Sequence, residues 1–489
     1  MICRGLCRVM SVWLLTAALG VTEASAQDAN ARGPTSPQDT GASVSTYNRV
    51  PLSDAGSSTV ETAVNEPVPK PLADFTHWLE DRGINFRGSE IDQWAANPSG
   101  GVREGHTNVG QFQAGFDLNL DKLIGLPDTL FHVVVYRDYG YALNVQNTGT
   151  FTKQQYIYKN AYPQWHLGLF AFEWRLLGNS LDIFLGRLGS TNYYGHLVAN
   201  CQFISGTLCG EPRILVSEAG LSLLPSATWG TNIKYRPTPH TYIESGVFEV
   251  NPTVQPSNGL HWSTAAATGF TVPVEWAWVN SNPRTIQYPF ELKVGAFVST
   301  APLNDPYYNT RYQSRALRGG TALTDATDRY GVYTMADKVI WRPDPNATQG
   351  LNVFGGVVQM LEEAEVMDQQ IYTGVVLTAP FRGRPQDTLG LSVSEFELTP
   401  GEQRYLQDER IKLKGGGLQA AHQIDWDLTY SLHLARGVEF MSSVQYMIHP
   451  DNSQIAATRV TPGNVFAYSV GIRIDLGYAL GFMRGVASD

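Results

Sequence analysis

Charged and amide side chains recur two residues apart in several segments of this chain, and such groups could bind a polar solute. Carboxylates accept hydrogen bonds, and guanidinium and ammonium groups donate them, so together they can replace the water around a hydroxyl-rich solute. Both signs of charge occur, whereas a pore for anions should show a surplus of Lys and Arg. The residues two apart are Asp117 and Asn119; Glu173 and Arg175; Asn232, Lys234 and Arg236; Glu291 and Lys293; Asp425 and Asp427; Arg473 and Asp475, and Glu439 and Gln445 are six apart, which is also an even spacing.

A two-residue spacing indicates β-strands, because successive side chains of a strand point to opposite faces. In residues 422–433, Trp426 and Leu428 alternate with Asp425 and Asp427. The same alternation of apolar and polar residues runs through residues 466–478. Each strand therefore has one apolar face and one polar face.

The spacing of the candidate strands indicates a closed barrel in a membrane. Short connections such as 178–180 and 239–240 alternate with long ones such as 192–226 and 301–329, and only 362–368 breaks the pattern. Short periplasmic turns, long outer loops and an even strand number are typical of outer-membrane barrels. We therefore predict an all-β fold, a transmembrane antiparallel β-barrel of about 16 strands. The predicted strands are 84–95, 106–120, 130–142, 164–177, 181–191, 227–238, 241–252, 272–280, 290–300, 330–343, 351–361, 369–381, 387–398, 419–435, 438–450 and 465–482.

The composition is consistent with a barrel sheet that has one apolar face and one face in contact with water. Of 489 residues, 43% are hydrophobic and only 16% are charged, and the mean hydropathy is −0.18. After the N-terminus, no segment approaches the ~18 apolar residues that a membrane helix needs. A net charge of −10 argues against a nucleic-acid partner.

The N-terminus predicts export. Residues 1–26 have the charges, the apolar centre and the small-residue cleavage site of a signal peptide. Residues 27–71 are predicted to be a disordered polar leader, and residues 72–489 the barrel domain, with a short helix at 72–83. In an exported chain Cys201 and Cys209 are expected to form a disulfide, with two thiols as the alternative.

The sequence shows no motif typical of an enzyme or of a cofactor site. It lacks a Gly-x-Ser-x-Gly, a phosphate loop and a His-Glu-x-x-His, and its ten histidines have no metal-ligand spacing. We expect no catalysis, metal or cofactor. A barrel enzyme and a secreted glycan-binding protein remain alternatives.

Several phrases resemble the carbohydrate-selective outer-membrane porins of the OprB family. They are WAANPSGG, FDLNLDKLIGLP, CQFISGTLCG, LPSATWG, VFEVNP, VPVEW, ADKVIWR and DLTY…VQYMIHP, in this order between Trp94 and Pro450. The resemblance implies a 16-stranded pore in the bacterial outer membrane through which monosaccharides and related small sugars diffuse. Two features depart from the family: His449-Pro450-Asp451 replaces its usual Pro-Gly pair, and seven residues follow the final Phe482. A general diffusion porin for small polar solutes is the alternative, and a homotrimer is a candidate assembly.

Solute contacts are expected on the polar faces and in the loop at 192–226, which in porin-type barrels commonly folds inward. The family resemblance adds Arg187 to this set, and each member could equally be a solvated group without a solute role. Aromatic residues such as Trp276 and Trp278 could form a stacking path or a girdle at the membrane interface. The predicted solute-binding residues are Glu173, Arg175, Arg187, Lys234, Asp425, Asp427, Arg473 and Asp475.

Overall fold

The computed structural model describes residues 68–157, 165–209, 211–222, 226–254, 258–280, 288–325, 328–344, 347–362 and 364–482. The predicted signal peptide, the leader up to residue 67 and the tail after Phe482 lie outside the described residues. The helix expected at 72–83 is α2, Lys70–Asp81. None of the described helices is long and apolar enough to cross a membrane.

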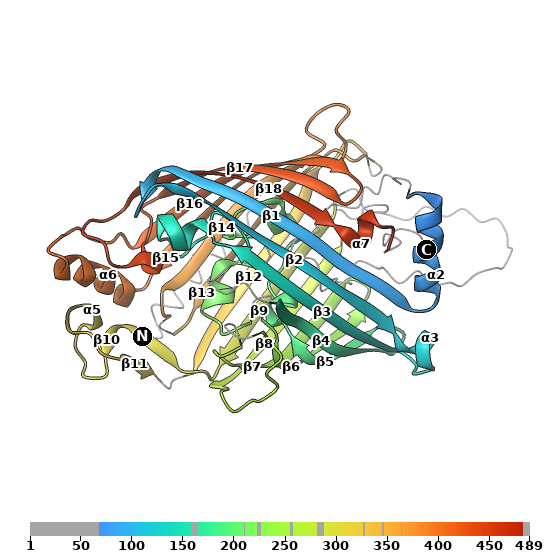
Figure 1. Cartoon of the computed structure of the whole chain (residues 1–489), viewed down its shortest axis with the longest axis horizontal. Coiled ribbons are helices and arrows are strands. Elements are labelled where there is room, and N and C mark those ends of the chain that lie inside the picture. Colours follow the sequence, from blue (N-terminus) through green and yellow to red (C-terminus); the bar gives the residue numbers. More distant parts are fainter. Residues whose placement is uncertain are drawn as a thin grey trace, which may run out of the picture. The chain divides into compact units, whose positions relative to one another are not determined.

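Sixteen strands form one closed antiparallel barrel, which confirms the predicted fold (Figure 1). Neighbours in the wall follow the chain order, except that β9 pairs with β12 and β1 closes the barrel on β18. The strands are β1 Ile84–Gly101, β2 Gly105–Asn119, β3 Thr129–Gly140, β4 Trp165–Leu176, β5 Leu181–Leu188, β6 Thr228–Thr238, β7 Thr241–Val250, β8 Gly269–Asn280, β9 Phe290–Ser299, β12 Arg329–Trp341, β13 Gly350–Met360, β14 Met367–Thr378, β15 Thr388–Leu398, β16 His422–Ala435, β17 Val438–Ile448 and β18 Gly463–Asp475.

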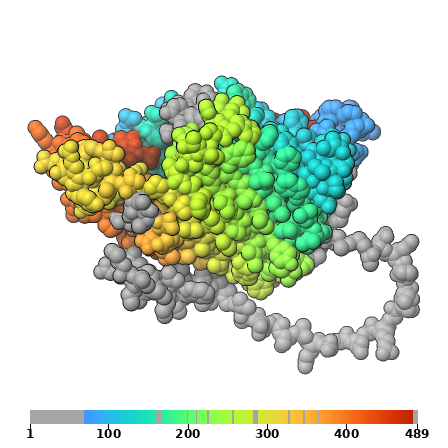
Figure 2. All heavy atoms as spheres, turned by 90° about the horizontal axis from the view of Figure 1, so that it is seen from below, coloured from blue at the N-terminus to red at the C-terminus, as the bar shows by residue number. Residues whose placement is uncertain are grey.

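The alternation read from the sequence separates the two sides of the wall. On β16, Trp426 and Leu428 are 42% and 46% exposed on the outer side, whereas Asp427 is 5% exposed on the inner side. Figure 2 shows the outer side of another part of the wall, coloured green to cyan, as a continuous surface. A membrane can therefore cover the apolar side while the polar side faces the lumen.

The long connections lie at one end of the barrel, which also carries the short β1–β2 and β13–β14 connections (Figure 1). Helix α2 lies at the opposite end, near α3, Leu120–Ile124. The end with the long connections carries α5, Arg315–Arg318, and α6, Pro400–Lys412. It also carries a two-stranded sheet of β10, Leu303–Asn309, and β11, Ala322–Asp325. The sequence did not predict this small sheet.

The last strand ends seven residues before its predicted end at 482. The Asp475 side chain accepts a hydrogen bond of 2.8 Å from the backbone N–H of Tyr478, which starts the helical turn α7, Leu476–Ala479. An aspartate at this position is a favourable helix cap. The alternating pattern of residues 476–482 is therefore not strand.

The connection between β5 and β6 folds into the barrel, as expected for porin-type folds. We call its described part, residues 189–209, 211–222 and 226–227, the inner loop. It contains the short helices η3 Ser190–Asn192, η4 Val198–Gln202 and α4 Arg213–Ser217. Phe203 is fully buried and lies over Gly390 of β15, where a Cβ atom would come within 2.9 Å of its ring.

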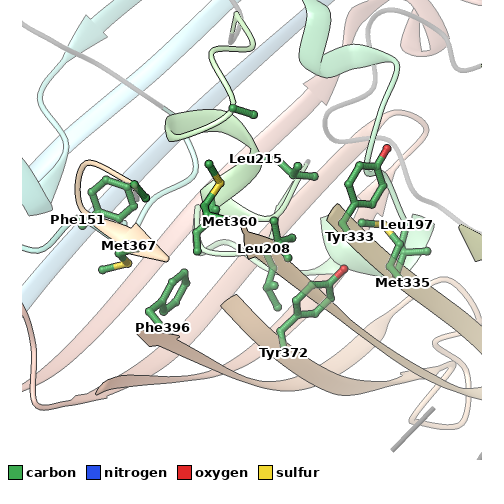
Figure 3. Packing of buried hydrophobic residues seen from close by; sticks show 14 of the residues in the cluster. Phe151, Leu197, Leu208, Leu215, Tyr333, Met335, Met360, Met367, Tyr372 and Phe396 are labelled. Atoms are coloured by element: carbon green, nitrogen blue, oxygen red, sulfur yellow. The ribbon is translucent and has the colours of Figure 1, made fainter. Parts of the chain in front are cut away.

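The inner loop rests on an apolar stretch of the inner wall, where the sequence led us to expect a wet face. Leu197, Leu208 and Leu215 of the loop pack in one buried cluster with Tyr333 and Tyr372 of the wall (Figure 3). Burial of these side chains stabilises the loop inside the barrel by roughly 1.5–3 kcal/mol for each large apolar residue. A second segment, residues 141–157 with η2 Asn144–Thr148, also lies inside, and Gln155 donates to the carbonyl of Gln93 at 2.7 Å.

Candidate functional site

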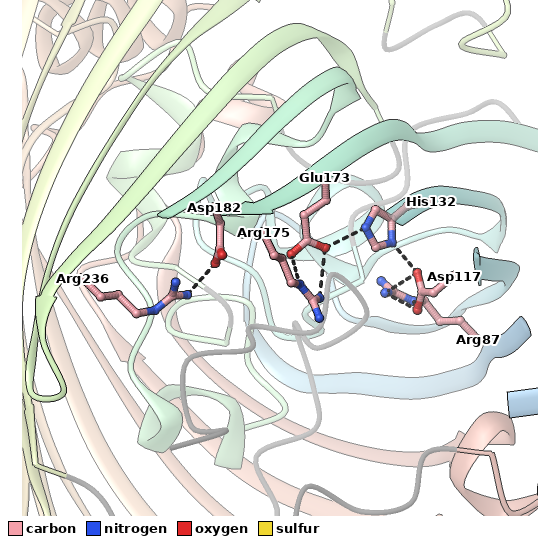
Figure 4. Close-up of polar contacts among 7 residues, drawn as sticks. All are labelled: Arg87, Asp117, His132, Glu173, Arg175, Asp182 and Arg236. Carbon is pink, nitrogen blue, oxygen red and sulfur yellow. Dashed lines mark hydrogen bonds and ion pairs between the residues drawn. The ribbon is translucent and has the colours of Figure 1, made fainter. Parts of the chain in front are cut away.

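A row of charged side chains with alternating sign crosses the inner wall over six neighbouring strands (Figure 4). We call it the charged row. Each member points inward because it shares the parity of the buried side chains on its strand. In strand order the row contains Arg87 of β1, Asp117 of β2, His132 of β3, Glu173 and Arg175 of β4, Asp182 of β5 and Arg236 of β6.

His132 joins the first half of the row. Its Nδ1 lies 2.6 Å from Asp117 Oδ1 and its Nε2 lies 2.9 Å from Glu173 Oε2. Carboxylates only accept hydrogen bonds, so both ring nitrogens donate and the ring is a cation. Arg87 closes this end of the row with a 2.6 Å bond from Nη2 to Asp117 Oδ2.

The second half of the row is built from arginine–carboxylate pairs. Arg175 Nε donates to Glu173 Oε1 at 2.6 Å, and Arg236 Nη2 donates to Asp182 Oδ2 at 2.6 Å. The side chain of Arg175 is 25% exposed, whereas that of Glu173 is only 5% exposed. Arg175 is therefore presented to the lumen by a carboxylate that is itself buried.

The inner loop is fastened to the wall by buried polar groups. Glu275 of β8 accepts from the Gly195 N–H at 2.9 Å and from the hydroxyls of Tyr242 and Tyr333 at 2.6 and 2.8 Å. Lys293 of β9 donates to the His196 carbonyl. These bonds place one edge of the loop against β7, β8, β9 and β12.

Asp425 and Asp427 lie beneath the inner loop, and not in an open constriction. Asp427 accepts from the Ser205 N–H of the loop at 3.3 Å and from the hydroxyls of Thr429 and Ser443 at 2.7 Å each. Asp425 accepts from Gln423 at 2.9 Å. Both carboxylates are nearly covered, so their contacts support the loop.

The other predicted inward residues form ion pairs or hydrogen bonds with neighbouring groups. Lys234 pairs with Glu244 at 3.0 Å and lies 3.8 Å from the centre of the Tyr242 ring. Arg473 pairs with Glu439 at 3.2 Å, near the Tyr156 ring of the second inner segment. Asp475 caps α7. These three groups hold the wall and its neighbours together.

Arg187 faces the outer side of the wall, which corrects its predicted place in the lumen. It pairs across strands with Phe170 and Trp229, and the outward Leu185 on the same strand is 51% exposed. Residues 258–268 of the β7–β8 connection cover its side chain, whose guanidinium lies 5.7 Å from the Trp229 ring. The side chain donates to the carbonyls of His261 and Gly259 at 3.3 and 3.5 Å.

We expect Arg187→Ala to loosen this cover and to leave the pore unchanged. The variant loses a cation–π contact and the packing of the side-chain stem, worth about 1 kcal/mol together. Limited proteolysis of the folded barrel should cut within residues 258–268 faster than in the wild type. Arg175→Ala is the matched control and should not change this cleavage, while an altered sugar conductance in Arg187→Ala would contradict the outward placement.

Buried carboxyls make the docking of the inner loop depend on pH. Burial raises the pKa of Glu218 to about 7, although its side chain accepts from the backbone N–H of Glu365 at 2.9 Å. Burial likewise raises the pKa of Glu211 to about 8. Between the ordinary value of 4.5 and these values, the docked loop holds protons that a released loop gives up.

Docking should therefore weaken as the pH rises through this window and level off above it. Each group contributes at most ~1.4 kcal/mol per pH unit. We expect open-channel current noise to increase between about pH 5 and about pH 8, and to increase less in Glu218→Gln. An identical pH dependence in the variant would contradict this role of Glu218.

Cys201 and Cys209 lie side by side in the inner loop. The side chains of the two residues are in contact, and the hydrogen bond with Cys201, together with burial, raises the pKa of Cys209 well above its ordinary value.

The aromatic residues divide between the two sides of the wall. Trp276 and Trp278 of β8 are 38% and 42% exposed on the outer side, which favours the interface girdle. Tyr193 and Tyr194 are buried in the inner loop. Trp262 lies outside the wall against Phe170, with ring centres 5.2 Å apart.

Sequence reasoning missed Arg87, His132 and Asp182. Arg87 and His132 share the inward parity of Asp117 through the cross-strand pairs Arg87–Gly115 and His132–Asp117. That signal could have been found once the register was known. The register itself depends on pairing between strands, which a single strand does not reveal.

A closed 16-stranded barrel with an apolar outside, an inward-folded loop and a charged inner wall defines an outer-membrane porin. A family model described as "Carbohydrate-selective porin, OprB family" matches residues 103–474, and the chain belongs to this family. It is an outer-membrane channel through which sugars diffuse.

Two similar proteins are consistent with this assignment. Porin B of Pseudomonas aeruginosa is 23% identical over 406 residues, which cover 78% of this chain and 88% of that protein. The high-pH structure of Pseudomonas putida OprB is 21% identical and has a TM-score of 0.72. The superposition covers 81% of this chain and 95% of the OprB chain. At this identity the structural likeness shows the shared fold.

Proposed function

We propose that small sugars cross the barrel along the charged row and that Arg175 is the residue that meets them. The observation that carries this proposal is that the row offers donors and acceptors in alternation, with Arg175 as a partly exposed member. A guanidinium held by a carboxylate keeps free N–H groups for sugar hydroxyls. Because the charges of the row nearly cancel, a neutral solute meets no strong field, and its release stays fast.

Planar-bilayer conductance with added monosaccharides tests this proposal. Arg175→Ala should weaken the block of ion current by glucose about ten-fold, which corresponds to the loss of one charge-assisted contact. Asp427→Ala is the matched comparison, because Asp427 supports the inner loop from beneath. It should change conductance and noise more than the affinity for sugar. Equal glucose block in Arg175→Ala and the wild type would overturn the proposal.

Selectivity for sugars distinguishes this function from a general diffusion porin. Liposomes that contain the protein should swell faster in glucose than in an amino acid or an anion of similar size. Equal rates for all three solutes would favour the general porin. We also propose that the barrel has no catalytic role, since Asp117 and Glu173 are both engaged by cations and neither is set up as a proton donor.

We further propose that, after export, a thiol–disulfide oxidant of the periplasm accepts two electrons and two protons from Cys201 and Cys209 and leaves a disulfide that stiffens the inner loop. Their contact supports this bridge, and the loop-entropy model gives roughly 2–3 kcal/mol for so short a ring. Reduction should increase open-channel noise in the wild type and have no effect in Cys201→Ser/Cys209→Ser. Unchanged noise and sugar block after reduction of the wild type would exclude this role.

A further inference from the structure

A small cavity lies between the inner loop and three strands of the wall. Strands β15, β16 and β17 form one side of it, and residues 203–208 of the inner loop form the other. Its volume is about 10 Å³, which is the space that one water molecule or one small ion needs. The polar residues around it include Thr207, Ser392, Ser394, Asp425, Asp427 and Gln445.

The strand register brings the polar residues of the wall together. Ser394 pairs across strands with Asp425, and Asp427 lies between Ser392 on one side and Gln445 on the other. Cross-strand neighbours have Cβ atoms about 5 Å apart, so the oxygens at the ends of their side chains can approach a common point. Thr207 of the inner loop lies close to Asp425. The residues come from four separate elements, and therefore no spacing in the sequence indicates the site.

Several oxygens around the cavity have capacity for a ligand. Within the described part of the chain, four of them are buried and form no hydrogen bond of ordinary length and angle: Asp425 Oδ2, Gln445 Oε1, Ser394 Oγ and Thr207 Oγ1. Each of these residues is more than nine-tenths buried. Buried polar atoms almost always have a partner, so four such atoms around one cavity indicate a bound ligand.

The cavity also collects negative charge. Asp425 and Asp427 are both more than nine-tenths buried, and neither forms an ion pair among the described residues. The hydroxyls of Thr429 and Ser443 donate to Asp427 Oδ1, whereas Oδ2 accepts only a long bond of 3.3 Å from the Ser205 N–H. Two buried carboxylates without a cation are unfavourable, and the site therefore favours a ligand of positive charge.

We propose that the cavity binds one Ca²⁺ ion and that this ion fastens the inner loop to the wall. Ca²⁺ takes about six to eight oxygen ligands in flexible geometry, and every candidate ligand here is an oxygen. Mg²⁺ keeps several of its waters, for which so small a cavity has no room. Two carboxylates balance two positive charges, which favours a divalent ion over Na⁺. The proposed ligands are Asp425, Asp427, Gln445, Ser392, Ser394 and Thr207.

Calcium binding to the purified full-length protein tests this site. The protein is treated with EDTA in detergent, and the binding of radioactive Ca²⁺ is measured by equilibrium dialysis without sugar. The wild type should bind one ion per chain that Asp425→Asn/Asp427→Asn binds at least about ten-fold more weakly. Glu439→Gln is the matched control and should bind like the wild type, because this inward carboxylate of β17 already pairs with Arg473. Heat-modifiable gel migration verifies that each variant forms a closed barrel.

A second variant tests the ligand set without a change of charge. Thr207→Val keeps nearly the same shape and both carboxylates, and should weaken Ca²⁺ binding about ten-fold. In planar bilayers Ca²⁺ should lower the current noise of the wild type more than that of Thr207→Val, and Mg²⁺ should have little effect on either.

Three results would each overturn the proposal. They are a wild type that binds no Ca²⁺, in which case water or protons on the carboxyls occupy the cavity; binding that is retained in the double asparagine variant; and equal effects of Mg²⁺ and Ca²⁺ on the noise. Because no sugar is present in these measurements, their failure would leave the proposed path of sugars along the charged row unaffected.

Discussion

Glu275→Ala is expected to release one edge of the inner loop and to raise single-channel conductance about two-fold or more. The carboxylate accepts three hydrogen bonds, from the Gly195 N–H of the loop and from the hydroxyls of Tyr242 and Tyr333. Its removal leaves three buried donors without an acceptor, at about 1–3 kcal/mol each. The loop can satisfy its own N–H only by moving toward water, which widens the channel and increases current noise.

Two variants separate loss of the anchor from loss of the fold. Glu275→Gln keeps an acceptor oxygen and should show a smaller increase in conductance. Tyr333→Phe removes one of the three donors and should change the conductance little. Heat-modifiable migration should be retained in all three proteins. If Glu275→Ala conducts like the wild type, the loop is held by its apolar contacts alone, and the anchoring role of Glu275 is wrong.

The barrel could be predicted from sequence because its two determinants are local. Alternation within residues 422–433 places Trp426 outside and Asp427 inside, and the length of most connections shows at which end of the barrel they lie. Neither property needs knowledge of the neighbouring strand. All sixteen predicted strands are therefore present. The errors are at strand ends, such as that at Asp475 where the side chain caps a helical turn, and in the missed small sheet of β10 and β11.

The roles of the inward residues could not be predicted in the same way. Parity places Asp425 and Asp427 inside the barrel, but only the tertiary structure shows that Ser205 of a loop more than two hundred residues away covers them. The prediction for Arg187 is wrong for a different reason. Arg187 has the same parity as the outward Leu185 and therefore points away from the lumen. It is nevertheless buried, because residues 258–268 of the β7–β8 connection cover its side chain.

His132→Leu is expected to destabilise the barrel by about 3 kcal/mol and to make the pore more selective for cations. The variant removes two short charge-assisted hydrogen bonds, to Asp117 and to Glu173. Both carboxylates keep one arginine each, so the barrel should still close, but the row loses one positive charge. The reversal potential in a salt gradient measures selectivity, and the unfolding midpoint in denaturant measures stability.

Asp182→Asn provides the control within the same row, since it removes a negative charge from the 2.6 Å pair with Arg236. It should shift the reversal potential in the opposite direction. His132→Gln removes the same charge as His132→Leu but keeps hydrogen-bonding atoms, so it should match the leucine variant in selectivity and lose less stability. The comparison separates the effect of the His132 charge on selectivity from the effect of its hydrogen bonds on stability. A His132→Leu protein with unchanged reversal potential would show that the ring carries no charge in the open pore, and the alternating row would then be wrong at its centre.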